Sequence, residues 1–272
     1  MRMRRAMILT ALVGAAIMAW LAIPTAQAAI PETKRVVIVI APYLTWSDID
    51  ETATPTMWSL AQTGSIGDIN ARSRTREPGE PPSPLEGALT ISAGAWAVPS
   101  HSAAAAYNIH ERFEVGTADE AFRRMTGDQV GVNSIVFLGF PMTASTNAER
   151  GPEAVLGTLG QAIEDAGGLS AAIGNSDVGY VTGEQRRVRP AALAAMNDKG
   201  LVRLGDISTR MLEEDPHAPF GIRTDMEYFE RALAEVDDRT AEHEGPSLIV
   251  LDAGDGYRAQ RFEAQVTPSI AA

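Results

Sequence analysis

Hydrophobic positions fall into four short runs, and each run is too uniformly apolar for a strand that has one face in water. The first of them, rich in β-branched residues, follows Arg35 directly. Strands with both faces covered by helices have this continuous pattern, which is typical of parallel sheets. The four runs are residues 36–40, 135–138, 171–173 and 248–251. We therefore predict that all four belong to one mainly parallel sheet.

Helical patterns lie between these runs. Thr54 and Pro55, with Gly64 farther on, supply the capping hydroxyl, the first-turn proline and the terminal glycine of a helix at residues 56–63. Apolar side chains three or four positions apart predict further helices at residues 153–166 and 226–236. A buried strand, a loop and a capped helix are the opening of an α/β domain. In such domains ligands usually collect at the carboxyl ends of the strands.

The first residues have the pattern of an export signal. Arg2, Arg4 and Arg5 precede an apolar stretch at residues 6–23, and residues 26–28 have the small-x-small form that a signal peptidase cleaves. We expect cleavage directly after that triplet. The alternative is an uncleaved membrane anchor, because the apolar stretch nearly reaches the length of a membrane span. Either way we expect an exported protein, located outside the cell or in the cell envelope, with membrane association through this segment as an option.

Residues 29–258 suffice for one α/β domain, and the Ala- and Gln-containing segment 259–272 is predicted to be a disordered tail. Loss of the three leader arginines changes the formal net charge from -12 to -15. This acidity argues against nucleic-acid binding and gives no attraction to anionic lipids. It also repels phosphorylated substrates at long range, so a phosphate site needs local metals or amide donors. Because the chain has no cysteine, no disulfide supports the exported domain.

Polar residues follow two of the predicted strands. Asp252 and Asp255 come after the last strand, and carboxylates at this spacing suit a metal ion, although a plain Asp-Gly turn explains them equally well. Arg258 has the geometry to bind a phosphate with two nitrogens, or to form an ordinary ion pair. Residues 175–177 predict a polar turn, for which an Asx turn is the simpler interpretation and a ligand cleft the alternative.

Three segments together resemble the alkaline phosphatase superfamily. They are residues 36–64, with the strand and the capped helix, residues 88–94, and residues 248–255. The likeness is greatest to a bacterial group of exported, often membrane-anchored proteins of that superfamily. It implies an alkaline-phosphatase-like three-layer sandwich with a mainly parallel sheet, shortened at its C-terminus.

The resemblance also implies a site. In the superfamily two metal ions, usually zinc, flank a serine or threonine nucleophile, and the cations clamp the attacking and leaving oxygens of phosphoryl transfer. Thr90 matches the nucleophile by position, with Ser92 as a weaker substitute, and Asp252 and Asp255 match metal ligands. The alternative for Thr90 is a hydroxyl that caps a local element. We expect Thr90 and the two carboxylates to converge at the carboxyl edge of the sheet, near the loop that begins at Pro42.

The chain departs from the family pattern in two places. Pro42 and Tyr43 stand where active members carry a metal-binding aspartate, and Asp48, farther on, has the spacing of a cap or turn residue. No histidine pair has metal-ligand spacing. The four histidines are His101, His110, His217 and His243.

Two functions remain open from the sequence. The first is a hydrolase of phosphate esters, sulfate esters or phosphodiesters, with zinc or another divalent metal and a small-molecule or envelope ester as substrate. The second is a catalytically degenerate binding or scaffold module of the cell envelope, which keeps the sheet and holds no metal. Fold ancestry alone does not decide between them.

Overall fold

The centre of the molecule is a four-stranded sheet in which all strands run parallel, in the order β1-β13-β6-β10. The computed structural model describes residues 34–67, 83–150, 153–181, 184–185 and 187–270. The predicted signal peptide or anchor, residues 1–28, lies outside the described residues. The four strands are β1 (Arg35–Ile40), β13 (Ser247–Asp252), β6 (Leu169–Ile173) and β10 (Leu204–Asp206). The predicted α/β class with a mainly parallel sheet is therefore confirmed.

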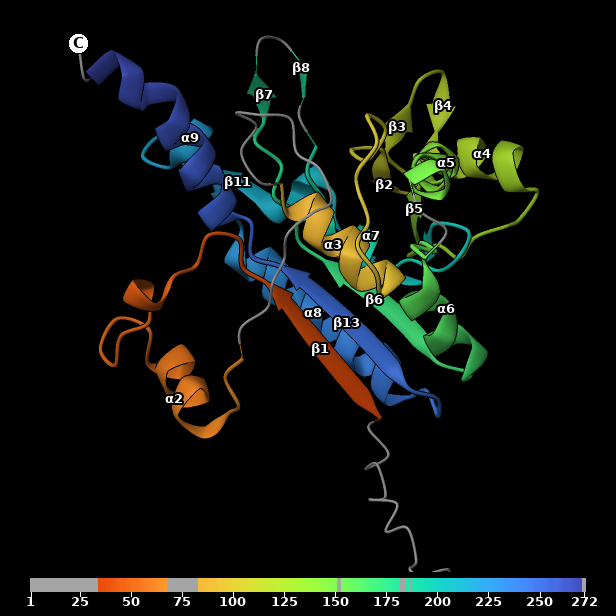
Figure 1. Ribbon diagram of the computed structural model, residues 1–272, viewed down its shortest axis with the longest axis horizontal. Helices are drawn as coiled ribbons and strands as arrows, with labels where there is room; N and C mark the ends of the chain where they lie inside the picture. Colours follow the sequence, from red (N-terminus) through yellow and green to blue (C-terminus); the bar gives the residue numbers. More distant parts are fainter. Residues whose placement is uncertain (1–33, 68–82, 151–152, 182–183, 186, 271–272) are drawn as a thin grey trace, which may run out of the picture. The chain divides into compact units, whose positions relative to one another are not determined.

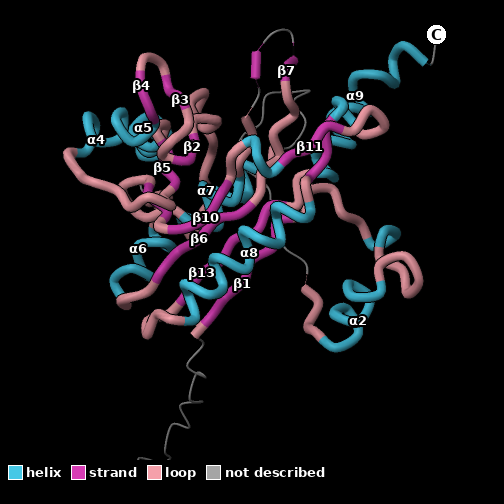
Figure 2. Tube along the Cα trace, turned by 180° about the vertical axis from the view of Figure 1, so that it is seen from behind, coloured by secondary structure: helices cyan, strands magenta, loops and turns pink. Residues whose placement is uncertain are grey.

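Helices cover both faces of this sheet, an arrangement compatible with three layers. On one face α7 (Pro190–Ala195) lies against β13 and β6, and α3 (Pro84–Ala93) packs on α7, in front of the sheet in Figure 1. On the other face α8 (Met226–Ala241) packs on β6 and β10, and the view from behind in Figure 2 shows it in front of the sheet. Because side chains alternate along β13, some pack in the main core under α7 and others in the apolar layer between the sheet and α8. Leu248 and Val250 face α7, and Ile249 faces α8.

One of the four predicted strands belongs to another sheet. β5 (Ile135–Phe137) pairs antiparallel with β2 (Ala106–Asn108) and β9 (Leu201–Val202), so the prediction of one sheet for all four runs is wrong at this strand. Its side chains alternate between the main core, which takes Ile135, and a smaller core, which takes Val136. A strand buried on both faces has the same apolar pattern in either sheet, so the pattern could not assign it.

β1 is an edge strand, and its predicted cover on both faces is also wrong. Within the described part of the chain it pairs only with β13. Val36 on one face is 42% exposed, and Val37 and Val39 on the other are 50% and 59% exposed. Ile38 packs against the main core. The helix α8 packs mainly on β6 and β10 and reaches the start of β1, where Arg35 bonds Asp237 and Thr240, so Val37 and Val39 stay exposed.

The helix predictions are confirmed in position and corrected at their ends. The helix α9 (Asp255–Ile270) runs through most of the segment 259–272, for which the sequence predicted a disordered tail; alanine, glutamine and arginine there favour helix. The other described helices are η1 (Trp46–Asp48), α2 (Pro55–Thr63), α4 (Ala118–Thr126), α5 (Phe140–Arg150), α6 (Thr158–Asp165), η2 (Thr209–Met211) and η3 (Pro219–Gly221). The remaining strands form hairpins: β3 (Arg112–Phe113) with β4 (Gly116–Thr117), β7 (Tyr180–Val181) with β8 (Glu184–Gln185), and β11 (Leu212–Glu214) with β12 (Ile222–Thr224). Among the described residues, no helix is both long enough and apolar enough to span a bilayer.

Candidate functional site

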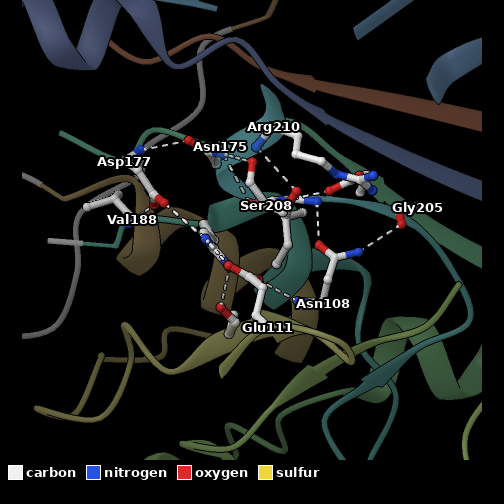
Figure 3. A network of polar contacts seen from close by, with 12 residues as sticks. Asn108, Glu111, Asn175, Asp177, Val188, Gly205, Ser208 and Arg210 are labelled. Atoms are coloured by element: carbon white, nitrogen blue, oxygen red, sulfur yellow. Dashed lines mark hydrogen bonds and ion pairs between the residues drawn. The ribbon is translucent and has the colours of Figure 1, made fainter. Parts of the chain in front are cut away.

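Polar side chains gather where the parallel strands end. Asp252 is the last residue of β13, Asp206 is the last residue of β10, and the turn at residues 175–177 follows β6. Because parallel strands end at one edge of a sheet, these segments meet there, as predicted for the two strand ends that the sequence identified. Figure 3 shows part of this network around Asn175 and Asp177. Both of these residues and Asp252 are almost completely buried.

Asp252 is a buried carboxyl group with a single hydroxyl partner. The Ser176 hydroxyl donates toward its two oxygens, at 2.9 Å and 3.0 Å. Burial raises the pKa of Asp252 to about 8, and the Ser176 hydrogen bond and the nearby charge of Arg258 only partly oppose this. At neutral pH most molecules therefore carry Asp252 as a neutral acid.

Arg258, in the first turn of α9, uses all five of its N–H donors inside the protein. Two go to Asp255 Oδ1, at 2.7 Å and 3.2 Å, and one goes to the Thr224 hydroxyl at 2.7 Å. The remaining two reach the carbonyl oxygens of Asn175 at 3.1 Å and Asp177 at 3.3 Å. The guanidinium is fully buried and ties α9 to the turn after β6. In this position it has no donor left for a substrate phosphate.

Asp255 is held as an anion by the same arginine. Partial burial raises the pKa of Asp255, but the hydrogen bonds and charge of Arg258 outweigh this, with help from the Thr224 backbone N–H. The pKa of this carboxyl therefore ends below its ordinary value. Asp255 also lies near the loop that begins at Pro42: the ring of Tyr43, in that loop, stacks on the ring of Tyr257, with the ring centres 6.3 Å apart.

These two carboxyl groups do not fit a zinc site. Zinc needs ionised carboxylates with free lone pairs and usually at least three protein ligands. Both oxygens of Asp252 already accept from the Ser176 hydroxyl, and Asp255 Oδ1 accepts two hydrogen bonds from Arg258, itself a buried cation. No cluster of three histidine, aspartate or glutamate side chains able to hold a metal occurs among the described residues. All four histidines are exposed.

Thr90 lies in the helical layer. It belongs to the last part of α3, and its hydroxyl accepts a hydrogen bond from the Ala97 N–H at 3.3 Å. Thr90 therefore has a local structural bond, although it lies inside a helix and not at the start of an element, where the alternative from the sequence had it capping. Ser92, the weaker substitute, is buried and accepts from the Gly157 N–H at 3.0 Å. The structure thus joins Asp255 and Arg258 by hydrogen bonds and places Asp252 close enough for both charges to act on it. No hydrogen bond connects Thr90 to these three residues.

Sequence reasoning missed an ion-pair cluster beside this site. Arg189 is buried and bonds Asp177 Oδ2 through two nitrogens, at 3.1 Å and 3.2 Å. Its other contacts are with Glu111, at 2.5 Å and 2.9 Å, and the Ala106 carbonyl at 2.9 Å. Burial raises the pKa of Asp177, and the charge of Arg189 opposes this. No local motif marks these residues, since they come from three separate segments of the chain.

The turn at residues 175–177 has the simpler of its two predicted forms. Asn175 Oδ1 accepts the Asp177 N–H at 3.1 Å, which is an Asx turn. The Asn175 amide group also donates to the carbonyls of Ile207 and Ser208, at 3.0 Å and 2.8 Å. The Asn175 side chain therefore both closes the turn after β6 and binds the backbone that follows β10.

Comparison of the chain with family models, curated proteins and solved structures finds no match. The interpretation of the site therefore depends on its own geometry and chemistry.

Proposed function

We propose that this chain is an exported, metal-free module of the alkaline-phosphatase-like type that binds a ligand in the cell envelope and does not hydrolyse esters. The observation that carries the proposal is the state of the strand-end acids. Asp252 is buried and accepts from the Ser176 hydroxyl, and the cationic Arg258 donates two hydrogen bonds to Asp255 Oδ1. An arginine in that place provides the charge balance that a metal cation would otherwise supply.

The position of Thr90 supports the same conclusion. A nucleophilic hydroxyl needs a base or a metal to lower its pKa. The Thr90 hydroxyl instead accepts a hydrogen bond from the backbone at Ala97, and it has no bond to an acid or a histidine of the described segments. The alkaline-phosphatase-like ancestry remains a proposal that the three sequence segments support.

Metal content and ester hydrolysis test the proposal. The purified chain is equilibrated with zinc, manganese or magnesium, desalted and analysed for bound metal. It is then assayed with p-nitrophenyl phosphate, bis(p-nitrophenyl) phosphate and p-nitrophenyl sulfate. We expect less than stoichiometric metal, and hydrolysis at the background rate that Thr90→Ala shares.

Variants sharpen this experiment. Asp48→Asn is the matched control, because Asp48 lies in an exposed turn where its carboxylate accepts from the Thr45 N–H at 2.8 Å. Stoichiometric metal that Asp252→Asn removes and Asp48→Asn retains would overturn the proposal. So would turnover that Thr90→Ala abolishes.

A further inference from the structure

A cavity of about 540 Å³ opens between β10 and α8, and neither Asp252 nor Asp255 lines it. One stripe of α8 lines it, with residues three or four positions apart that include Tyr228, Arg231 and Glu235. Asp206, the last residue of β10, and Arg210, in the segment after the strand, also line it. Its volume lies in the usual range of small-molecule sites, and it adjoins the carboxyl end of a parallel strand.

Two of the acidic side chains in the lining are neutralised within the cavity wall. Asp206 accepts hydrogen bonds from Arg210 at 2.7 Å, Tyr228 at 2.8 Å and the Ser208 N–H at 2.8 Å. Burial raises the pKa of Asp206, but the Ser208 and Tyr228 hydrogen bonds outweigh it, so this carboxylate stays ionised. Glu235 pairs with Arg239 at 2.9 Å.

Glu111, the third acid of the lining, points its oxygens at the buried Arg189. Each acid of the cavity therefore already has an arginine partner. None of the three is left to attract a ligand cation.

The arginines beside Tyr228 have donors to spare. Arg210 and Arg231 hold their guanidinium carbons 5.2 Å and 5.3 Å from the centre of the Tyr228 ring. Arg231 has no ion pair or hydrogen bond with any described residue, and Arg210 uses only one side-chain nitrogen, on Asp206. Two planar cations near one ring, with a single carboxylate bonded to one of them, leave an excess of positive charge and of N–H donors at this point.

We infer that this cavity binds a small molecule whose carboxylate or phosphate group is held by Arg210 and Arg231. The body of the ligand packs against the apolar part of the lining, which consists of Val132, Leu204, Ala232 and Val236. The inference rests on the proposed function, since it names the site at which the module binds. The formal charge of -12 repels anions at long range, so recognition here depends on contacts inside the cavity.

Calorimetric titration of the full chain with benzoate, phenyl phosphate and benzamidine tests the inference. These probes share one ring and differ in the charged group. We expect at least one of the two anions to bind and the cation benzamidine not to bind. The stronger of the two anions identifies the group that the site prefers.

Two variants assign the binding to the arginines. Arg231→Gln should weaken anion binding about tenfold or more, because it removes a charged hydrogen-bond donor. Arg231→Lys should weaken it less. Arg223→Gln is the matched control, an exposed arginine on β12 that pairs with Glu213 and Asp215, and it should leave binding unchanged. Since Arg231 is exposed, its replacement should not disturb folding, which thermal melting verifies.

Three results would overturn the inference. The first is no anion binding up to about 10 mM, a concentration far above what a functional site requires. The others are benzamidine binding as tight as anion binding, and equal losses of anion affinity in Arg231→Gln and Arg223→Gln. Phenyl phosphate separates this failure from failure of the proposed function. Its hydrolysis would refute the non-catalytic module and leave the cavity assignment standing. Absence of both binding and hydrolysis would refute only the cavity assignment.

Discussion

Replacement of Asp252 by asparagine should stabilise the protein at neutral pH. The carboxyl group is fully buried, and burial raises its pKa from 3.8 to about 8. The folded protein therefore keeps a proton that the unfolded chain releases. Asparagine keeps the shape of the side chain and an oxygen that accepts from the Ser176 hydroxyl, and it never has to ionise.

The size of the effect follows from the two pKa values. Because the folded-state pKa is the higher one, stability is greatest below pH 4 and falls as pH rises from about 4 to about 8. Each pH unit in that window costs about 1.4 kcal/mol, so Asp252 destabilises the fold by about 4 kcal/mol at pH 7. Between pH 5 and pH 7.5 the free energy of unfolding of Asp252→Asn should gain about 3 kcal/mol relative to the wild type.

Urea unfolding at the two pH values, followed by tryptophan fluorescence and far-ultraviolet circular dichroism, measures this difference. Asp255→Asn is the control of opposite sign. Its pKa is lowered in the folded state, so its contribution is present above the unfolded pKa of 3.8 and disappears as pH falls through the folded value. Asp255→Asn should therefore destabilise at pH 7.5. An Asp252→Asn effect that is the same at pH 5 and pH 7.5 would refute the reasoning.

Two further predictions concern stability and use the same urea measurement. Arg189→Met should lower the free energy of unfolding by about 3 kcal/mol or more, because it leaves Asp177 and Glu111 without their cation. The control Arg203→Met, at an exposed ion pair, should lower it by less than about 1 kcal/mol. Equal losses in the two variants would contradict the burial assigned to Arg189. Val39→Lys should change stability by less than about 0.5 kcal/mol because its side chain is exposed, whereas Ile249→Lys on the neighbouring strand should cost more than about 4 kcal/mol; a severe loss from Val39→Lys would mean that β1 is covered.

Local features of the chain were sufficient for the class of fold. Capping and glycine signals placed α2 within one residue, and apolar spacing placed the start of α8 at Met226. The same kind of pattern identified three strands of the parallel sheet. It could not show that β1 is an edge strand or that β5 pairs elsewhere, because an apolar run reports burial tendency and not the identity of its neighbours.

The candidate site likewise has one part that the sequence predicted and another that only the tertiary structure shows. The position of Asp252 at the end of a strand was predictable, because the strand and the residue after it are adjacent in sequence. Its raised pKa was not, since burial causes it and Ser176 and Arg258 partly oppose it, and tertiary folding brings both of these residues from elsewhere in the chain. The buried partners of Arg189 lie 12 and 78 residues away. Sequence thus determined which elements form, and only the tertiary structure decided which charges meet, because ion pairs and desolvation depend on distances in space.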